Sequence, residues 1–298
     1  MIFGGIMATK DKKIIVIVGV TASGKSSLAL KIAQRYSGEI VCADSWTVYK
    51  GFDIGAAKPS QADTELVRHH MLDVAEATDH FSAAVFKDQA KNIIDDIHSR
   101  DMLPLLVGGN GLYVDSILYD YSFLPQSDPK VRSQLNACSL QELQEIVADA
   151  GYDTAGIDLK NKRRVIRLIE NDGERPSRSD SIRPSTLVLG VDVSKSKNRA
   201  LIEQRVELMF RKGLKHEVKE LAALYGWDNE AMKGIGYAEF KEYFNGDVSL
   251  SAVKRHIVSN SLHLAKRQRT WFKKNTHIVW TASEEEAYTH IDSFLNNR

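Results

Sequence analysis

The chain has 298 residues, enough to bury a full hydrophobic core in one large domain or two small ones. With 43% hydrophobic and 27% charged residues, it has the composition of an ordinary soluble globular protein, and no apolar run is long enough to span a membrane. The net charge of +1 argues against a generally basic protein, so a nucleic-acid-binding surface would have to come from local clusters of Lys and Arg.

The cysteines and the first residues bear on where the protein works. Cys42 and Cys138 cannot form a zinc site from sulfur alone, and we expect a reduced, cytoplasmic protein. The first eight residues, MIFGGIMA, are apolar but lack the basic start of a signal peptide. Either Met1 or Met7 could be the functional start.

Residues 14–27 contain the strongest motif of the chain. Ile14 to Val18 are all apolar and mostly β-branched, which predicts a buried strand, and apolar residues at helical spacing follow over 27–35. Between them lies a complete G-x-x-x-x-G-K-[ST] sequence, formed by Gly19, Val20, Thr21, Ala22, Ser23, Gly24, Lys25 and Ser26. Because this motif needs a strand before it and a helix after it, its context indicates a phosphate-binding P-loop.

The residue types of the P-loop predict its ligand. Gly19 and Gly24 let backbone N–H groups turn inward, and these donors, with the helix N-terminus, favour an anion. Lys25 adds a mobile positive charge, and the Ser26 hydroxyl can hold Mg²⁺. We therefore expect a diphosphate or triphosphate to bind, although the motif does not say which one.

Strands and helices alternate after the P-loop. We expect strands at 39–43 and 103–107, helices at 83–99 and 112–118, a helix cap at Ser82, and irregular chain over 48–80. This order predicts an α/β fold of the P-loop NTPase type, a parallel sheet with helices on both faces. His69 and His70 are adjacent, so their side chains diverge, and we interpret them as structural residues rather than metal ligands.

The carboxyl ends of the predicted strands mark the candidate site, because ligands of such sheets bind there. Asp44-Ser45 and Gly108-Gly109 lie at those ends together with the P-loop, which singles out Asp44 among the acids. From residue type alone, Asp44 could equally be a helix cap or a Mg²⁺ ligand through water.

The composition changes in the middle of the chain. We predict that residues 1–120 and 186–298 are two parts of the core, and that 121–185 form a mainly helical insertion. The insertion carries a basic run, made of Lys162, Arg163, Arg164, Arg167, Arg175, Arg178 and Arg183. A solvated helix face is the ordinary explanation of a charge run, but the smaller number of acids favours phosphate contact here. We expect helices to start at Asp128-Pro129 and at Ser139, and a mobile loop from Gly173 to Ser185.

The last part of the chain predicts further core elements. We expect strands at 186–191 and 278–280 and helices at 197–212, 214–225 and 251–274. The first of these strands should rejoin the sheet. Gly234-Ile235-Gly236-Tyr237 separates two helical stretches.

Together these segments resemble the tRNA dimethylallyltransferases, also called tRNA isopentenyltransferases. The matching stretches run in family order: GVTASGKS (19–26), ADS (43–45), YKGFDIGAAKP (49–59), HHMLD (69–73), FSAAVF (81–86), VGGNGLY (107–113), RRVIR (163–167), GIGYAE (234–239) and AKRQRTWF (265–272). The P-loop alone is generic, but the Asp-Ser, Gly-Ile-Gly-Tyr and Lys-Arg-Gln segments together are specific.

The resemblance implies transfer of a dimethylallyl group from dimethylallyl diphosphate to N6 of the adenine on the 3′ side of the tRNA anticodon. It implies that Thr21 and Lys25 hold the diphosphate and that Asp44 contacts the amine. An aryl amine is a weak nucleophile, and Asp44 suits the role of its general base. The positions implied to contact the tRNA anticodon stem-loop are Asp44, Ser45, Trp46, Thr47, Asn110, Arg132, Arg163, Arg164, Val165, Ile166 and Arg167. We further expect the protein to be a monomer, to use Mg²⁺ and not to bind a membrane.

The sequence departs from the family pattern at three positions. The family usually has Pro at Val20, Gln at Thr47 and Thr at Asn110. Thr47 is too short to make a two-point amide contact with an adenine edge, which bears on base recognition. The zinc finger of eukaryotic members is absent, which favours a bacterial-type enzyme.

Three other functions share parts of this pattern. An adenylate isopentenyltransferase acting on AMP, ADP or ATP would have the same P-loop, and the basic insertion argues instead for RNA. A small-molecule kinase would bind ATP in the P-loop. A nucleotide-gated RNA-binding protein without catalysis would use Asp44 only as a cap or for Mg²⁺.

Overall fold

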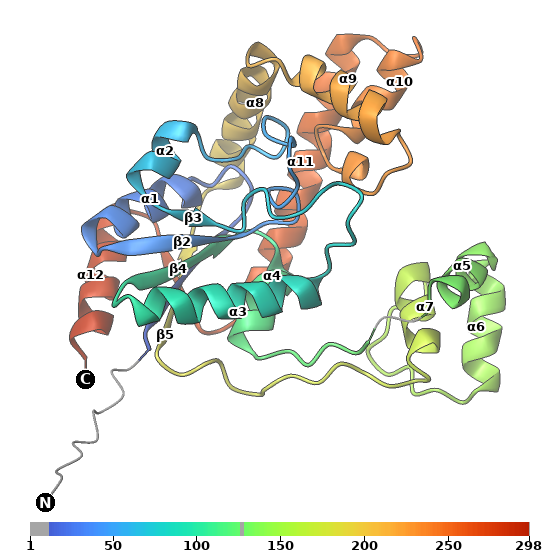
Figure 1. The fold of residues 1–298 in the computed structure, drawn as a ribbon, viewed down its shortest axis with the longest axis horizontal. Coiled ribbons are helices and arrows are strands. Elements are labelled where there is room, and N and C mark those ends of the chain that lie inside the picture. The colour runs from blue at the N-terminus through green and yellow to red at the C-terminus, as the bar shows by residue number, and fades with distance from the viewer. Residues whose placement is uncertain (1–11, 126–127, 298) are drawn as a thin grey trace, which may run out of the picture. The chain divides into compact units, whose positions relative to one another are not determined.

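The computed structural model describes residues 12–125 and 128–297, so Met1 and Met7 lie outside the described residues. A six-stranded sheet forms its centre, in the order β3-β2-β4-β1-β5-β6 (Figure 1). The strands are β1 (Ile14–Gly19), β2 (Gly38–Ala43), β3 (His69–His70), β4 (Leu103–Gly108), β5 (Thr186–Val191) and β6 (Ile278–Thr281). Every neighbouring pair is parallel, which confirms the predicted sheet and the return of β5 to it.

Helices cover both faces of the sheet, which explains why β1 is apolar at every position and buried throughout. On one face α1 (Lys25–Arg35) and α12 (Glu284–Asn296) pack over residues such as Ile15 and Ile17. Helices α3 (Ala83–Ser99) and α4 (Gly111–Leu118) lie together against β4 (Figure 1).

A second core lies among the helices that follow β5. It joins α8 (Lys195–Arg211), α9 (Leu214–Tyr225), α10 (Lys241–Phe244), α11 (Leu250–Phe272), η1 (Ala231–Lys233) and η2 (Ala238–Phe240). Phe52, Tyr237 and Phe240 are fully buried in it. The Gly234-Ile235-Gly236-Tyr237 segment runs between η1 and η2, so the predicted break between helical stretches is confirmed.

The chain divides into two compact units, of which the smaller is Tyr119–Ser181 and the larger holds the sheet. The smaller unit contains α5 (Pro129–Ala137), α6 (Leu140–Asp149) and α7 (Lys162–Glu170). Side chains of Asp128, Ser139 and Asn161 cap these helices, which confirms the two helix starts expected at 128 and 139. A small apolar core holds the three helices together.

Two sequence-based expectations need correction. Residues 48–80 are not irregular throughout, because they contain α2 (Gln61–Leu66) and β3. A reciprocal capping box between Ser60 and Asp63 starts α2, and pairing with β2 makes β3 a strand despite its length. Helix α12 was not predicted at all, although Ser283 caps it and acids fill its first turn.

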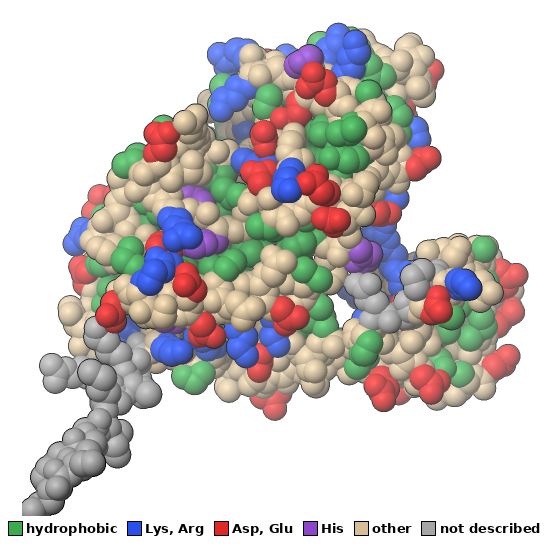
Figure 2. Space-filling view, viewed as in Figure 1, with side chains coloured by type: hydrophobic (Ala, Val, Ile, Leu, Met, Phe, Trp, Pro, Cys, Tyr) green, Lys and Arg blue, Asp and Glu red, His purple; other side chains and the backbone are tan. Residues whose placement is uncertain are grey.

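The surface carries both signs of charge. On the face drawn in Figure 2, Lys and Arg side chains are interspersed with Asp and Glu over the larger unit. Within the described ranges, none of the helices has an apolar stretch of the length needed to cross a membrane.

Candidate active site at the carboxyl edge of the sheet

The P-loop connects β1 to α1 and leaves the start of that helix open to a ligand. Gly24 caps α1 with a φ of 89°, which glycine adopts readily, and without a side-chain hydrogen bond. The first turn of α1 contains no acid, so its N–H groups and dipole face the loop with no negative side chain to compete. This geometry suits a bound phosphate group.

Two cations meet at the P-loop. The Lys25 ammonium donates to the Val20 carbonyl at 3.3 Å. Burial, and to a smaller extent the charge of Arg205, lower its pKa to about 8 against the opposing effect of Asp44. Arg205, on α8, donates to the Thr21 hydroxyl at 3.1 Å. Burial lowers the pKa of Arg205 and Asp44 partly offsets this effect. Arg205 belongs to no recognisable motif, so only the packing of α8 against the P-loop reveals it as part of the site.

Asp44 follows β2 and lies at the same edge as the P-loop, as expected from the strand order. Its Oδ1 accepts a hydrogen bond from the backbone N–H of Trp46 at 2.9 Å, which fixes the turn. Ala43 of β2 pairs with Gly108 of β4, and Gly108 also pairs with Val18 of β1. The three strand ends are therefore adjacent, and the predicted convergence is confirmed.

Asn110 holds the neighbouring turn together. Its side-chain oxygen accepts from the N–H groups of Leu112 and Tyr113, at the start of α4, while its amide donates to the Ser45 hydroxyl. The residue therefore caps a helix and positions Ser45. A threonine could also cap α4, but its hydroxyl could not reproduce all of these bonds.

Gln268, in the Lys-Arg-Gln segment of α11, ties the P-loop to the β4–α4 turn. Its Oε1 accepts from the Thr21 N–H at 2.7 Å, and its Nε2 donates to the Gly109 carbonyl at 2.9 Å. Asn198 of α8 adds a bond to the Thr21 carbonyl at 2.9 Å. The loop is thus held by two helices that come much later in the chain.

A cavity of about 250 Å³ opens beside these residues, and we call it the catalytic cavity. Its lining includes Thr21, Asp44 and Arg205, which lie at the P-loop and at the end of β2. The rest is mainly apolar and is lined by Trp46, Ile202, Val206, Met209, Ile235, Ile257 and Leu264, with Lys233, Ser261 and Arg267 also present. The arrangement suits a ligand with an anionic group and a short apolar group.

The other predicted P-loop and substrate positions differ in exposure. Ser26 is exposed at the start of α1, whereas the Ser23 hydroxyl is buried without a hydrogen-bond partner among the described residues. Val20 is 6% exposed and packs into the helical core. Thr47 is 7% exposed and its buried hydroxyl also has no partner there, so its side chain points into the protein.

The predicted tRNA-contacting residues of the smaller unit fall into two groups. Val165 and Ile166 are buried in its core, and Arg132 and Arg167 pair with the buried carboxylate of Glu170. The side chains of Arg163 and Arg164 are exposed on α7. These two remain the candidates for contact with a ligand from solution.

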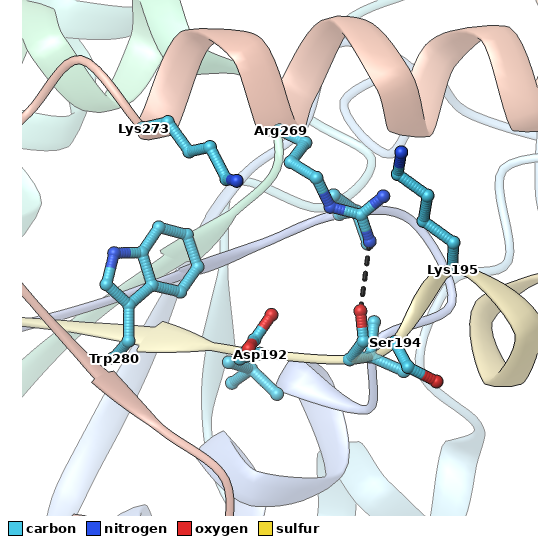
Figure 3. A pocket seen from close by; sticks show the side chains of 9 residues that line it. Asp192, Ser194, Lys195, Arg269, Lys273 and Trp280 are labelled. Atoms are coloured by element: carbon cyan, nitrogen blue, oxygen red, sulfur yellow. Dashed lines mark hydrogen bonds between the residues drawn. The ribbon is translucent and has the colours of Figure 1, made fainter.

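A second cavity, of about 470 Å³, lies next to Val20 at the end of β5, and we call it the basic cavity. Figure 3 shows Arg269 and Lys273 extending into it from α11, with Lys195 and Trp280 on its other sides. Arg269 donates to the Val193 carbonyl at 3.0 Å. The lining also contains the carboxylate of Asp192, so three cations and one anion surround this cavity.

Comparison with known proteins identifies the family. A family model described as IPP transferase matches residues 47–275. The chain belongs to the IPP transferase family. This confirms the resemblance drawn from the motifs.

Similar proteins match this chain over nearly its whole length. The tRNA dimethylallyltransferase of Bacillus velezensis is 35% identical over 92% of both chains, and that of Bacillus subtilis is 34% identical over 96% of this chain and 98% of its own. The crystal structure of a tRNA isopentenylpyrophosphate transferase from Bacillus halodurans is 31% identical, covers 95% of each chain and has a TM-score of 0.73.

Proposed function

We propose that this chain transfers a dimethylallyl group from dimethylallyl diphosphate to N6 of the adenine on the 3′ side of the anticodon in tRNA. The observation that carries the proposal is the catalytic cavity, in which the P-loop, Arg205 and Asp44 adjoin an apolar wall. The names of the similar proteins support the same reaction.

The reaction needs two kinds of group, and the cavity offers both. The adenine N6 forms a bond to the first carbon of the dimethylallyl group while that carbon loses its bond to the diphosphate oxygen. P-loop amides, Lys25 and Arg205 stabilise the charge on the leaving diphosphate. The amine proton passes to the Asp44 carboxylate, which acts as general base.

Mg²⁺ fits this site as an ion shared with the substrate. Among the described residues, no three His, Cys, Asp or Glu side chains are grouped to hold a metal by themselves, while the Ser26 hydroxyl is exposed beside the P-loop. Mg²⁺ commonly binds through few protein oxygens together with phosphate oxygens and water. Its charge would help to neutralise the diphosphate.

For the RNA, we propose contact through Arg163 and Arg164 of α7 as well as through the turn at Asp44–Trp46. The side chain of Thr47, which the resemblance implied as a further contact, is buried and does not face a ligand. The target adenine must leave the stack of the anticodon loop, as in other base-modifying enzymes. A tRNA substrate supports the expected cytoplasmic location. The monomeric state stays a prediction.

One assay tests this function against the alternatives. Labelled dimethylallyl diphosphate is offered with unmodified tRNA, with AMP, ADP or ATP, or alone, and ATP consumption is followed in parallel. We expect label only in tRNA and no use of ATP. Label in a free nucleotide would instead indicate an adenylate isopentenyltransferase, ATP consumption a kinase, and RNA binding without transfer a protein that only binds.

A further inference from the structure

The chain between Asp53 and Lys58, which we call the wall loop, lies between two cavities. Gly55 and Ala56 line the catalytic cavity, while the other residues of the loop line an outer cavity of about 450 Å³. Arg205 and Met209 line both cavities. The loop therefore forms the wall that keeps the catalytic cavity small.

A carboxylate from α9 holds the wall loop from behind. Glu217 accepts hydrogen bonds from three consecutive backbone N–H groups, those of Asp53 at 3.2 Å, Ile54 at 2.7 Å and Gly55 at 3.0 Å. Hydrogen bonds to an ionised acceptor are stronger than neutral ones, and three of them fix the backbone of a loop that is otherwise short of regular structure. Glu217 itself lies outside the lining of either cavity.

Tyr237, from the Gly-Ile-Gly-Tyr segment, completes this support. Its hydroxyl donates to Glu217 at 2.9 Å and accepts from the Ala56 N–H at 3.0 Å. Its ring is fully buried and lies so close to Gly55 that a side chain there would collide with it. A small residue at Gly55 is therefore required for this contact.

Lys58, the last residue of the wall loop, is also held by hydrogen bonds and ion pairs. The Lys58 ammonium bonds the Tyr49 carbonyl at 2.7 Å, Asp53 at 2.7 Å and Asp73 at 2.5 Å. The Lys58 side chain is only 7% exposed, so these bonds are partly shielded from water. The loop is held at both ends and along its length.

We propose that Glu217 and Tyr237 are positioning residues which, by holding the wall loop in place, restrict the prenyl donor to a five-carbon chain. This inference rests on the proposed function. The five-carbon group fits the apolar part of the catalytic cavity beside Arg205. One more isoprene unit would meet the wall loop, and a loosened loop would let that unit extend into the outer cavity.

The test compares donors of two lengths on one acceptor. Initial rates are measured with dimethylallyl diphosphate and with geranyl diphosphate on the same unmodified anticodon stem-loop RNA. The Tyr237→Phe variant keeps the buried ring but loses both hydrogen bonds, and Glu217→Gln weakens the support of the three N–H groups. We expect the ratio of kcat/KM for the short donor to that for the long donor to fall by about tenfold in each variant.

The Tyr243→Phe variant is the matched control, because the hydroxyl of Tyr243 accepts a bond from Lys215 away from the wall loop. Its donor ratio should equal that of the unchanged protein. Melting temperatures show whether a variant is folded. If Glu217→Gln is not folded, the donor ratio of the milder Tyr237→Phe variant tests the inference by itself. An unchanged ratio, or an equal loss with both donors, would overturn the inference. Absence of dimethylallyl transfer by the unchanged protein would instead overturn the proposed function.

Discussion

The carboxylate of Asp44 interacts favourably with both cations of the site, Lys25 and Arg205. Its charge raises the pKa of Lys25 and that of Arg205, opposing the effect of burial on each. A hydrogen bond from the Trp46 N–H orients one of its oxygens. The role proposed for Asp44, that of general base, rests on this place beside the P-loop, and two predictions about single residues test the site.

The Asp44→Asn substitution separates catalysis from binding. Asn keeps the size and the bond to Trp46 but cannot take up a proton, so we expect kcat to fall by about 10²–10⁴. Binding of tRNA and of dimethylallyl diphosphate should stay near normal, as steady-state titration of each substrate would show. The exposed Asp247→Asn variant serves as control. A normal kcat with a raised KM for tRNA would make Asp44 a recognition residue.

Lys25 should make diphosphate binding depend on pH. Its pKa of about 8 in the free protein means that it begins to lose its charge just above neutrality, whereas a bound anion raises the pKa. Affinity for inorganic pyrophosphate should therefore fall as the pH rises through about 8. The Lys25→Arg variant stays charged over this pH range. Calorimetry gives the pyrophosphate affinity of the unchanged protein and of this variant, and in their ratio the titration of pyrophosphate itself cancels. A constant ratio would contradict this prediction.

At the scale of elements, α7 combines structural and exposed arginines in nine residues. Arg167 donates to the Leu124 carbonyl at 2.6 Å and, with Arg132, pairs with Glu170, whose side chain is 1% exposed. Each arginine compensates part of the charge of this buried carboxylate, so substitution of either should destabilise the unit, and substitution of both should do so more. The exposed pair next to them offers a cleaner test of RNA contact.

Replacing Arg163 and Arg164 with Ala should lower the affinity for tRNA, and the remaining affinity should depend less on salt concentration. Each lost phosphate contact should lower the slope of log affinity against log salt by about 0.7–0.9. Filter binding at several salt concentrations gives the slope. A double variant of the exposed Lys91 and Lys219 removes the same charge from the larger unit and should change the slope less. Equal slopes in the Arg163/Arg164 variant and the unchanged protein would assign the arginines to a solvated face.

At the scale of the whole molecule, an ion pair formed by the buried carboxylate of Glu39 joins the edge of the sheet to a covering helix. Glu39 of β2 bonds Arg100, at the end of α3, and His70 of β3 at 2.7 Å. These bonds, above all those from Arg100, lower the pKa of Glu39 to about 2 from an ordinary 4.5. Because the carboxylate is stabilised in the folded state, its protonation must cost stability.

The free energy of unfolding should therefore fall in acid. The contribution of Glu39 is complete above about pH 4.5 and is lost as the pH falls from there toward about 2. Urea unfolding at several pH values measures it, and the Glu39→Gln variant should be less stable near neutrality and depend less on pH in this range. The exposed Glu285→Gln variant should behave like the unchanged protein. An equal pH dependence for Glu39→Gln would contradict this assignment.

The sequence alone determined the elements that depend on local patterns. The apolar strands, the P-loop between β1 and α1, and the caps at Ser82, Ser139 and Asp128 could all be predicted, because each depends on residues within a few positions of one another. The order of strands and helices was enough to place Asp44 at the same edge as the P-loop. The motifs were also enough to identify the family.

Only the tertiary structure decided which distant residues complete the site. Arg205, Gln268 and Glu217 reach the P-loop and the wall loop from helices more than 150 residues away in sequence. It also separated the exposed Arg164 from Arg167, which pairs inside the smaller unit. The two-residue strand β3 likewise exists only through its pairing with β2. Local sequence cannot specify such contacts, because burial and hydrogen-bond partners are fixed only when the elements pack.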